Sequence, residues 1–217
     1  MDETNASSQK DFPEWMVTQA LARHLGESGK ENPQRMAWLF GLEAQTPDGN
    51  RKLRDLCGFD WAAEQVCGGA EEAFKEKDKG KLSSEEFRQI FWTITPDFRY
   101  WTRQRDRQLI IEAKGTSKPI GQRDREQAKR YFAYLQKSDC KGAVIYFAPN
   151  PVAWLTWLED IGKKTIPEQD SGICFGVVDL KVQVVPRVAS ELVDVVGKAL
   201  VQTADLLKEA LRFSKTA

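Results

Sequence analysis

A glutamate and a lysine stand two residues apart inside an apolar run. The run is LIIEAKG, residues 109–115, and the charged residues are Glu112 and Lys114. Side chains two residues apart on a β-strand point to the same face, so both charges would project together while the apolar neighbours line the other face. Unpaired charges in an apolar environment are costly. The alternative, a salt bridge on an exposed strand face, fits the apolar neighbours poorly, so the pattern indicates a pair used for chemistry.

An aspartate upstream can join this pair. The extended runs 93–102 and 108–115 predict an antiparallel hairpin. A turn centred on residues 104–105 places Asp97 directly opposite Glu112, with Cβ atoms about 5 Å apart. A register slip of one residue would separate them. With the predicted register, the two carboxylates can share one cation.

Oxygen ligands of this kind suit Mg²⁺ or Mn²⁺. Asp97, Glu112 and the backbone carbonyl of Ala113, together with water, would form an open metal site. Such a metal lowers the pKa of a bound water and neutralises charge on a phosphate, and the Lys114 ammonium can orient that water and stabilise the transition state. The residues therefore predict metal-assisted chemistry on a phosphate group.

The elements after the hairpin would hold this site. Residues 122–137 carry an apolar stripe that predicts a helix, with Gln127 and Tyr131 as neighbours on one face. The apolar run at 142–148 is typical of a central strand covered on both faces.

Three further elements complete the chain. Asn150 and Pro151 predict an N-cap and a first-turn proline for a helix that ends at Gly162. An extended run follows at 173–185, and a long amphipathic helix at 188–213.

The N-terminal third has a different pattern. Residues 1–10 are predicted to be disordered, and 13–78 to form several helices joined by a turn at 46–50. Ser83 and Glu86 form a capping box that predicts a short helix before the hairpin.

The element order predicts an α/β fold with a mixed sheet flanked by helices. We expect a single domain over residues 11–217. It would comprise an N-terminal helical extension (11–80), a core that carries the motifs (81–150), and a segment that completes the core and ends in the C-terminal helix (151–217).

Charge is balanced overall but uneven along the chain. The protein has 32 basic and 32 acidic residues; residues 97–137 hold 11 basic and 5 acidic ones, whereas residues 1–86 hold 11 and 17. A solvated face is one interpretation of this basic block, but it flanks the predicted site, where a phosphate backbone would lie. The predicted nucleic-acid contacts are Arg99, Arg103, Arg105, Lys118, Arg123, Arg125, Lys129 and Arg130.

Other site types and locations are disfavoured by composition. The four cysteines contain no CxxC pair and there is one histidine, which argues against zinc or iron–sulfur sites. No apolar stretch has the length of a membrane span, and the first residues are polar and acidic, so we expect a cytoplasmic protein that does not contact a membrane.

The motif residues resemble those of a known superfamily. Pro96-Asp97 followed by Glu112-Ala113-Lys114 resembles the signature of the PD-(D/E)XK nucleases, and Gln127 with Tyr131 resembles the QxxxY motif of RecB-type nucleases and of the N-terminal nuclease domains of type I restriction enzyme motor subunits. The resemblance covers roughly residues 80–150. It implies a restriction-endonuclease-like αβββαβ core.

The resemblance also implies an activity, Mg²⁺-dependent cleavage of phosphodiester bonds in DNA. Asp97 and Glu112 would be metal ligands, Lys114 would lie beside the attacking water, and Gln127 and Tyr131 would support the site or touch the nucleic-acid backbone. Family members often add a glutamate from a preceding helix, for which the candidates are Glu72, Glu64 and Glu86. The family suggests a setting in defence, repair or mobile-element processing.

Two other readings stay open at this stage. The same fold could serve a non-catalytic nucleic-acid-binding or assembly subunit, or the ExK triplet could be a coincidence in a helical scaffold. For a nuclease, the sequence leaves open DNA or RNA, the number of strands, and internal or terminal cleavage. The final helix could form a homodimer seam or contact a partner protein.

Overall fold

The chain folds around a seven-stranded mixed sheet with the strand order β2-β1-β7-β6-β5-β4-β3. The computed structural model describes residues 13–25, 33–58, 66–70, 96–102, 106–119, 121–137, 141–166 and 172–214. β5, β6 and β7 are parallel, and the other pairings are antiparallel. The strands are β1 (Glu43–Thr46), β2 (Gly49–Lys52), β3 (Val66–Ala70), β4 (Phe98–Thr102), β5 (Arg107–Ala113), β6 (Lys141–Ala148) and β7 (Ile173–Asp179).

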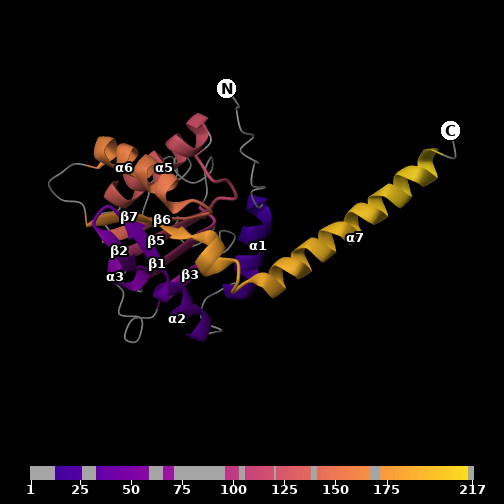
Figure 1. Ribbon diagram of the computed structural model, residues 1–217, viewed down its shortest axis with the longest axis horizontal. Helices are drawn as coiled ribbons and strands as arrows, with labels where there is room; N and C mark the ends of the chain where they lie inside the picture. The colour runs from indigo at the N-terminus through magenta and orange to yellow at the C-terminus, as the bar shows by residue number, and fades with distance from the viewer. Residues whose placement is uncertain are drawn as a thin grey trace, which may run out of the picture.

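Helices cover both faces of the sheet, which confirms the predicted α/β class with a helix-flanked mixed sheet (Figure 1). One face carries α5 (Gly121–Lys137) and α6 (Pro151–Thr165), and the other carries α1 (Glu14–Leu25), α2 (Pro33–Gly41) and α3 (Leu53–Cys57). Alternate residues of the central strands therefore enter two separate apolar cores.

The β4–β5 hairpin has the register that the sequence predicts. Phe98 pairs with Ile111 and Arg99 with Ile110. The next position outward therefore places Asp97, the residue before β4, opposite Glu112. Because the pleat alternates, the face toward α5 and α6 receives Glu112 and Ile110, and the other face receives Ile111.

Three elements after the hairpin agree with their predicted type. α5 spans 121–137, and β6 is the central strand of the sheet, with all but its first residue buried. At the start of α6 the Asn150 side chain accepts a hydrogen bond of 3.3 Å from the backbone N–H of Ala153. The predicted end of this helix at Gly162 is wrong, because α6 continues to Thr165. A Cβ atom at Gly162 would lie 2.8 Å from the Phe175 ring. The glycine therefore allows α6 to pack closely on β7.

Two expectations for extended and helical segments are also wrong. The extended run at 173–185 stops at Asp179, whose carboxylate accepts from the backbone N–H groups of Lys181 and Val182 and begins a π-helical turn over Leu180–Val184.

The N-terminal extension is not purely helical, because it also contributes β1, β2 and β3 to the sheet. Residues 46–50 turn between strands instead of helices, and β1 pairs with β7. The disorder predicted for 1–10 and the capping box at Ser83 and Glu86 lie outside the described residues.

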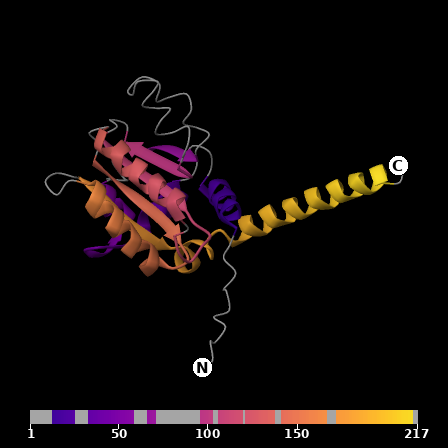
Figure 2. The same cartoon turned by 90° about the horizontal axis from the view of Figure 1, so that it is seen from above.

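The last helix, α7 (Ala189–Ser214), begins against α1 and then projects away from the sheet (Figure 2). Within the described ranges, no helix combines the length and the apolar character needed to cross a membrane.

Candidate active site

The hairpin brings two carboxylates to one face of the sheet. Asp97 Oδ2 accepts a hydrogen bond of 2.7 Å from the backbone N–H of Ala113, which fixes the aspartate beside the end of β5. Glu112 lies beneath α5 with only 3% of its surface exposed. This is the arrangement of Asp97 and Glu112 that the sequence predicts.

The Lys114 ammonium lies at the centre of an acidic cluster. Its Nζ atom is 3.0 Å from Glu112 Oε1 and 3.1 Å from Gln127 Oε1. It is also 3.4 Å from a carboxylate oxygen of Asp124 and 3.5 Å from one of Glu14. Lys114 is 6% exposed, so its charge is neutralised by these groups and not by bulk water.

Gln127 and Tyr131 join the same network from α5. The Gln127 amide nitrogen donates to Glu112 Oε1 at 2.7 Å and to the Tyr131 hydroxyl at 2.9 Å. Tyr131 in turn donates to Glu112 Oε2 at 2.8 Å. The i, i+4 spacing places both side chains over the glutamate. The structure thus brings together Asp97, Glu112, Lys114, Gln127 and Tyr131.

Burial sets the protonation balance of the acids. It raises the pKa of Asp97 well above its usual range, and the charge of Glu112 raises it further, against the opposing Ala113 hydrogen bond. Burial also raises the pKa of Glu112, because it outweighs the attraction of Lys114 and the hydrogen bonds from Tyr131 and Gln127. Burial by itself would lower the pKa of Lys114, but the charges of Glu112 and Glu14 raise it above its usual value, so the lysine stays cationic.

These acids fit a hard divalent cation. Burial raises the pKa of both carboxyl groups, and the charge of Glu112 raises that of Asp97 further, so a positive charge between them would favour their ionised forms. Their oxygens are the donors that Mg²⁺ and Mn²⁺ prefer. In the part of the chain that is described, no three His, Cys, Asp or Glu side chains gather closely enough to hold a metal together. A cation held by Asp97 and Glu112 would therefore take its remaining ligands from the Ala113 carbonyl, water or a substrate, as Mg²⁺ commonly does.

Two acidic residues of the cluster, Asp124 and Glu14, were not predicted from the sequence. Asp124 stands three residues before Gln127, so helical spacing could have indicated that it shares the Gln127 face. Glu14 begins α1 and has no such local signal, because only the tertiary fold brings α1 to the end of β5. The sequence predicts an additional site glutamate from a preceding helix, and the candidates for it, Glu72, Glu64 and Glu86, lie outside the described residues.

Tyr146 adds a hydroxyl near the network. It pairs with Glu112 across the parallel β5–β6 ladder, is fully buried, and stacks on Trp154 with ring centroids 5.4 Å apart. Its hydroxyl has no hydrogen-bond partner among the residues described. Burial, and then the negative charge of Glu112, raise the pKa of Tyr146, so the hydroxyl keeps its proton.

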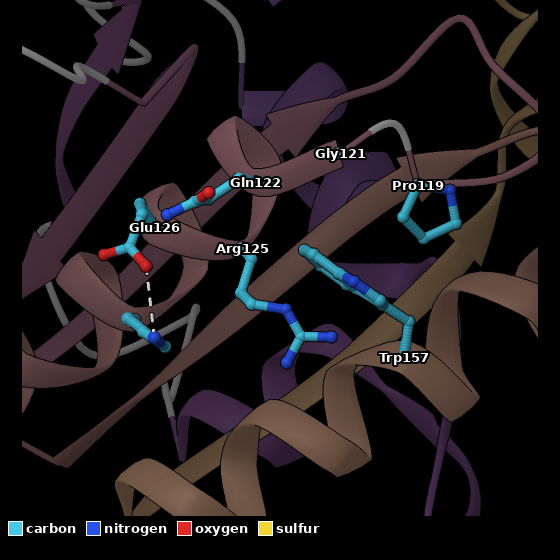
Figure 3. Close-up of a pocket in the computed structure, with 7 residues that line it drawn as sticks. Pro119, Gly121, Gln122, Arg125, Glu126 and Trp157 are labelled. Carbon is cyan, nitrogen blue, oxygen red and sulfur yellow. Dashed lines mark hydrogen bonds and ion pairs between the residues drawn. The ribbon is translucent and has the colours of Figure 1, made fainter.

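The predicted basic contacts divide into surface and buried groups. Lys118 and Arg123 are exposed near the start of α5, and Arg130 is partly exposed. Arg125 and Lys129 line a hollow of about 550 Å³ together with Trp157 and Pro119 (Figure 3). Arg103 and Arg105 lie outside the described residues.

Each cation of the hollow already has a carboxylate neighbour. Arg125 lies 3.1 Å from Asp160, and Lys129 lies 3.1 Å from Glu126. Trp157 also packs edge-on against Trp154, which is consistent with a role in helix packing. The hollow therefore combines an aromatic ring with two cations that are partly neutralised.

Arg99 corrects one surface prediction. It is 3% exposed, donates to the Gln108 side chain at 2.9 Å and to the Tyr134 hydroxyl, and its guanidinium lies over the Trp101 and Tyr134 rings. The reason is strand alternation, which points position 99 under α5 and not to solvent. In this structure the guanidinium holds α5 on the hairpin and does not offer a phosphate contact.

Comparisons with protein-family models, with curated proteins and with solved structures find no match for this chain.

Proposed function

We propose that this protein is a Mg²⁺-dependent nuclease of the PD-(D/E)XK superfamily that hydrolyses phosphodiester bonds in DNA. The observation that carries the proposal is the position of Asp97 opposite Glu112, with the Lys114 ammonium 3.0 Å from the glutamate. Buried acids with raised pKa values around a fixed ammonium are typical of functional sites.

The topology supports the family assignment. β3, β4 and β5 form an antiparallel meander, α5 follows, and β6 returns parallel to β5. The superfamily core has the order αβββαβ, and a βββαβ order with the motif residues on the hairpin and on α5 supports the proposed assignment.

The side chains divide the chemistry among them. Asp97 and Glu112 would hold Mg²⁺ or Mn²⁺, and the bound ion would supply a water of lowered pKa and neutralise charge on the phosphate. Lys114 orients the attacking water and stabilises negative charge that develops on the phosphate. Gln127 and Tyr131 hold the Glu112 carboxylate and the ammonium in their relative positions through the hydrogen bonds that link them.

The substrate backbone would lie over the start of α5. Lys118 and Arg123 are exposed there, and Arg125 and Lys129 continue the basic surface into the hollow beside Trp157. Contacts of this kind bind phosphates without reading bases, so we expect affinity that falls with added salt.

The test is cleavage of labelled DNA in linear, circular, single-stranded and duplex forms, with Mg²⁺, Mn²⁺ or EDTA. Glu112→Gln and Lys114→Met should each lower the cleavage rate by at least about a hundredfold. Lys163→Met, at a lysine that is exposed on α6, is the matched control and should cleave like the wild type. Near-ultraviolet circular dichroism shows that each variant is folded. Cleavage that survives both site variants, or that persists in EDTA, contradicts the proposed site.

One observation favours a second candidate, a non-catalytic nucleic-acid-binding or assembly subunit. Both oxygens of Glu112 already accept hydrogen bonds from protein groups, Oε1 from Lys114 and Gln127 and Oε2 from Tyr131. A purely structural network would look the same. Absence of cleavage on every DNA and RNA substrate, together with DNA binding that is unaffected by EDTA and by Glu112→Gln, would establish this candidate instead.

A further inference from the structure

α7 extends well beyond the body of the protein. Its first turns pack on α1, where Val195 is only 2% exposed. From Leu200 to Asp205 every residue is exposed, and both views show the helix standing clear of the sheet and its covering helices (Figures 1 and 2). A helix that packs against nothing gains little stability of its own in water.

The uncovered part of α7 is apolar on one side. Val193, Leu200 and Val201 are 70%, 66% and 61% exposed. Val193 and Leu200 are seven residues apart, which is close to two helical turns, so they share a face, and Val201 lies beside Leu200 on the edge of that face. Large apolar side chains gathered on one face of a projecting helix indicate a surface that another helix covers.

Two charges beside this face, Lys198 and Asp205, are opposite in sign and would meet in a reversed copy of the helix. Lys198 and Asp205 are exposed, opposite in sign and seven residues apart, so they lie on the same edge of the helix. A parallel pair of α7 helices would place Lys198 beside Lys198. An antiparallel pair centred near residues 201–202 would place Lys198 of each copy beside Asp205 of the other, with Leu200 and Val201 at the centre of the seam.

A lipid surface is a poorer occupant for the same face. The charged residues of α7 are four acids and three bases: Glu191, Asp194, Asp205 and Glu209, and Lys198, Lys208 and Arg212. Helices that lie on membranes carry mainly Lys and Arg on their polar face, because the lipid surface is anionic. Because α7 has no excess of basic residues, a protein occupant whose own charges match in the reversed direction is favoured over a lipid surface.

We propose that two copies of this chain associate through α7 as an antiparallel helix pair, with Leu200 and Val201 at the centre and reciprocal Lys198–Asp205 ion pairs at the edge. The two-fold symmetry uses each contact twice, as isologous dimers do. The proposal is independent of the nuclease function, because no residue of the candidate active site takes part in it.

The first test is the molar mass of the full chain by light scattering over a concentration series. The wild type should reach the mass of a dimer, and Val201→Glu should shift the midpoint of association to a concentration at least about tenfold higher. Val182→Glu is the matched control, because Val182 is 71% exposed but lies outside α7, and it should behave like the wild type. Far-ultraviolet circular dichroism checks that both variants keep their helix content. A monomer throughout the series, or a dimer that Val201→Glu does not weaken, overturns the proposal.

The second test addresses the direction of pairing. Lys198→Asp and Asp205→Lys should each weaken association severalfold, because each places like charges opposite one another in an antiparallel pair. The double variant restores opposite charges at both ends and should recover most of the wild-type association. A double variant that is weaker than either single variant overturns the antiparallel arrangement, and sedimentation of a monomer with anionic vesicles would assign the face to a membrane instead.

Discussion

The Tyr131 hydroxyl donates to Oε2 of Glu112 at 2.8 Å, and this bond holds one side of a carboxylate that is almost completely buried. Hydrogen bonds to buried charged groups contribute about 1.5–3 kcal/mol to stability. Tyr131→Phe should lower the free energy of unfolding by an amount in that range, measured by urea denaturation. Tyr100→Phe is the control, because the Tyr100 hydroxyl is also buried but has no hydrogen-bond partner among the described residues. Equal losses in the two variants would contradict a specific role for the Tyr131 bond.

Asp97→Asn should make the protein more stable while it abolishes cleavage. Burial and the charge of Glu112 raise the pKa of Asp97, so the folded state disfavours its ionised form, and each unit of such a shift corresponds to about 1.4 kcal/mol. An Asn side chain can still accept the Ala113 hydrogen bond.

The sign of this effect fixes its pH dependence. An acid with a raised pKa contributes a penalty that is absent below its ordinary pKa and grows as the pH rises toward the folded value. Asp97→Asn and wild type should therefore unfold alike near pH 4, which is about the ordinary value for aspartate, and the variant should be the more stable at neutral pH. Thermal unfolding across this range measures the difference; a variant less stable than wild type at neutral pH would contradict it.

The anchor of α7 should weaken in acid. Burial by itself would raise the pKa of Glu191, but hydrogen bonds from the Ser190 hydroxyl and the His24 ring lower it to about 2. An acid with a lowered pKa contributes stability that is present above its ordinary value of 4.5 and is lost as the pH falls toward 2.

Glu191→Gln isolates this contribution. The variant should be less stable than wild type above the ordinary pKa of Glu191, and the difference should shrink to nothing near pH 2. Thermal unfolding of both proteins at a series of pH values provides the measurement. A difference that stays constant through the acid range would show that the carboxylate charge is not what anchors the helix.

Two glycine substitutions should act in opposite directions. At Gly142 in β6 an added Cβ atom would lie 2.5 Å from the backbone oxygen of Gln108, so Gly142→Ala must push two central strands apart and should cost about 1–3 kcal/mol. At Gly197 in α7 nothing lies within 4 Å, and replacing a helical glycine by alanine should increase stability by about 0.5–1 kcal/mol. Denaturant unfolding measures the stability loss of Gly142→Ala, and the helix content on heating measures the stability gain of Gly197→Ala.

The part of the site that could be predicted is the part encoded by short-range pattern. Register in a hairpin follows from alternation and turn length, so the facing of Asp97 and Glu112 was predictable from the two strands and the turn alone. Helical spacing likewise gave the pairing of Gln127 with Tyr131. These positions depend on backbone geometry that is nearly independent of the rest of the chain.

The parts that could not be predicted depend on long-range packing. Glu14 reaches Lys114 only because α1 crosses the end of β5, and β1 becomes a strand because it pairs with β7, far along the chain. Arg99 looks like a surface cation by composition, yet aromatic rings and a glutamine enclose it. In each case a tertiary contact outweighs the local preference.

α1 makes a polar contact at each end. Glu14, its first residue, lies 3.5 Å from the Lys114 ammonium, and His24, in its last turn, lies 2.8 Å from Glu191 at the base of α7. The two residues are ten positions apart, which corresponds to about 15 Å of continuous helix. Because α1 is one continuous helix between these contacts, a change in the angle of α7 that keeps the His24–Glu191 bond would also move Glu14 relative to Lys114. The orientation of α7 and the charges around Lys114 are therefore coupled through α1.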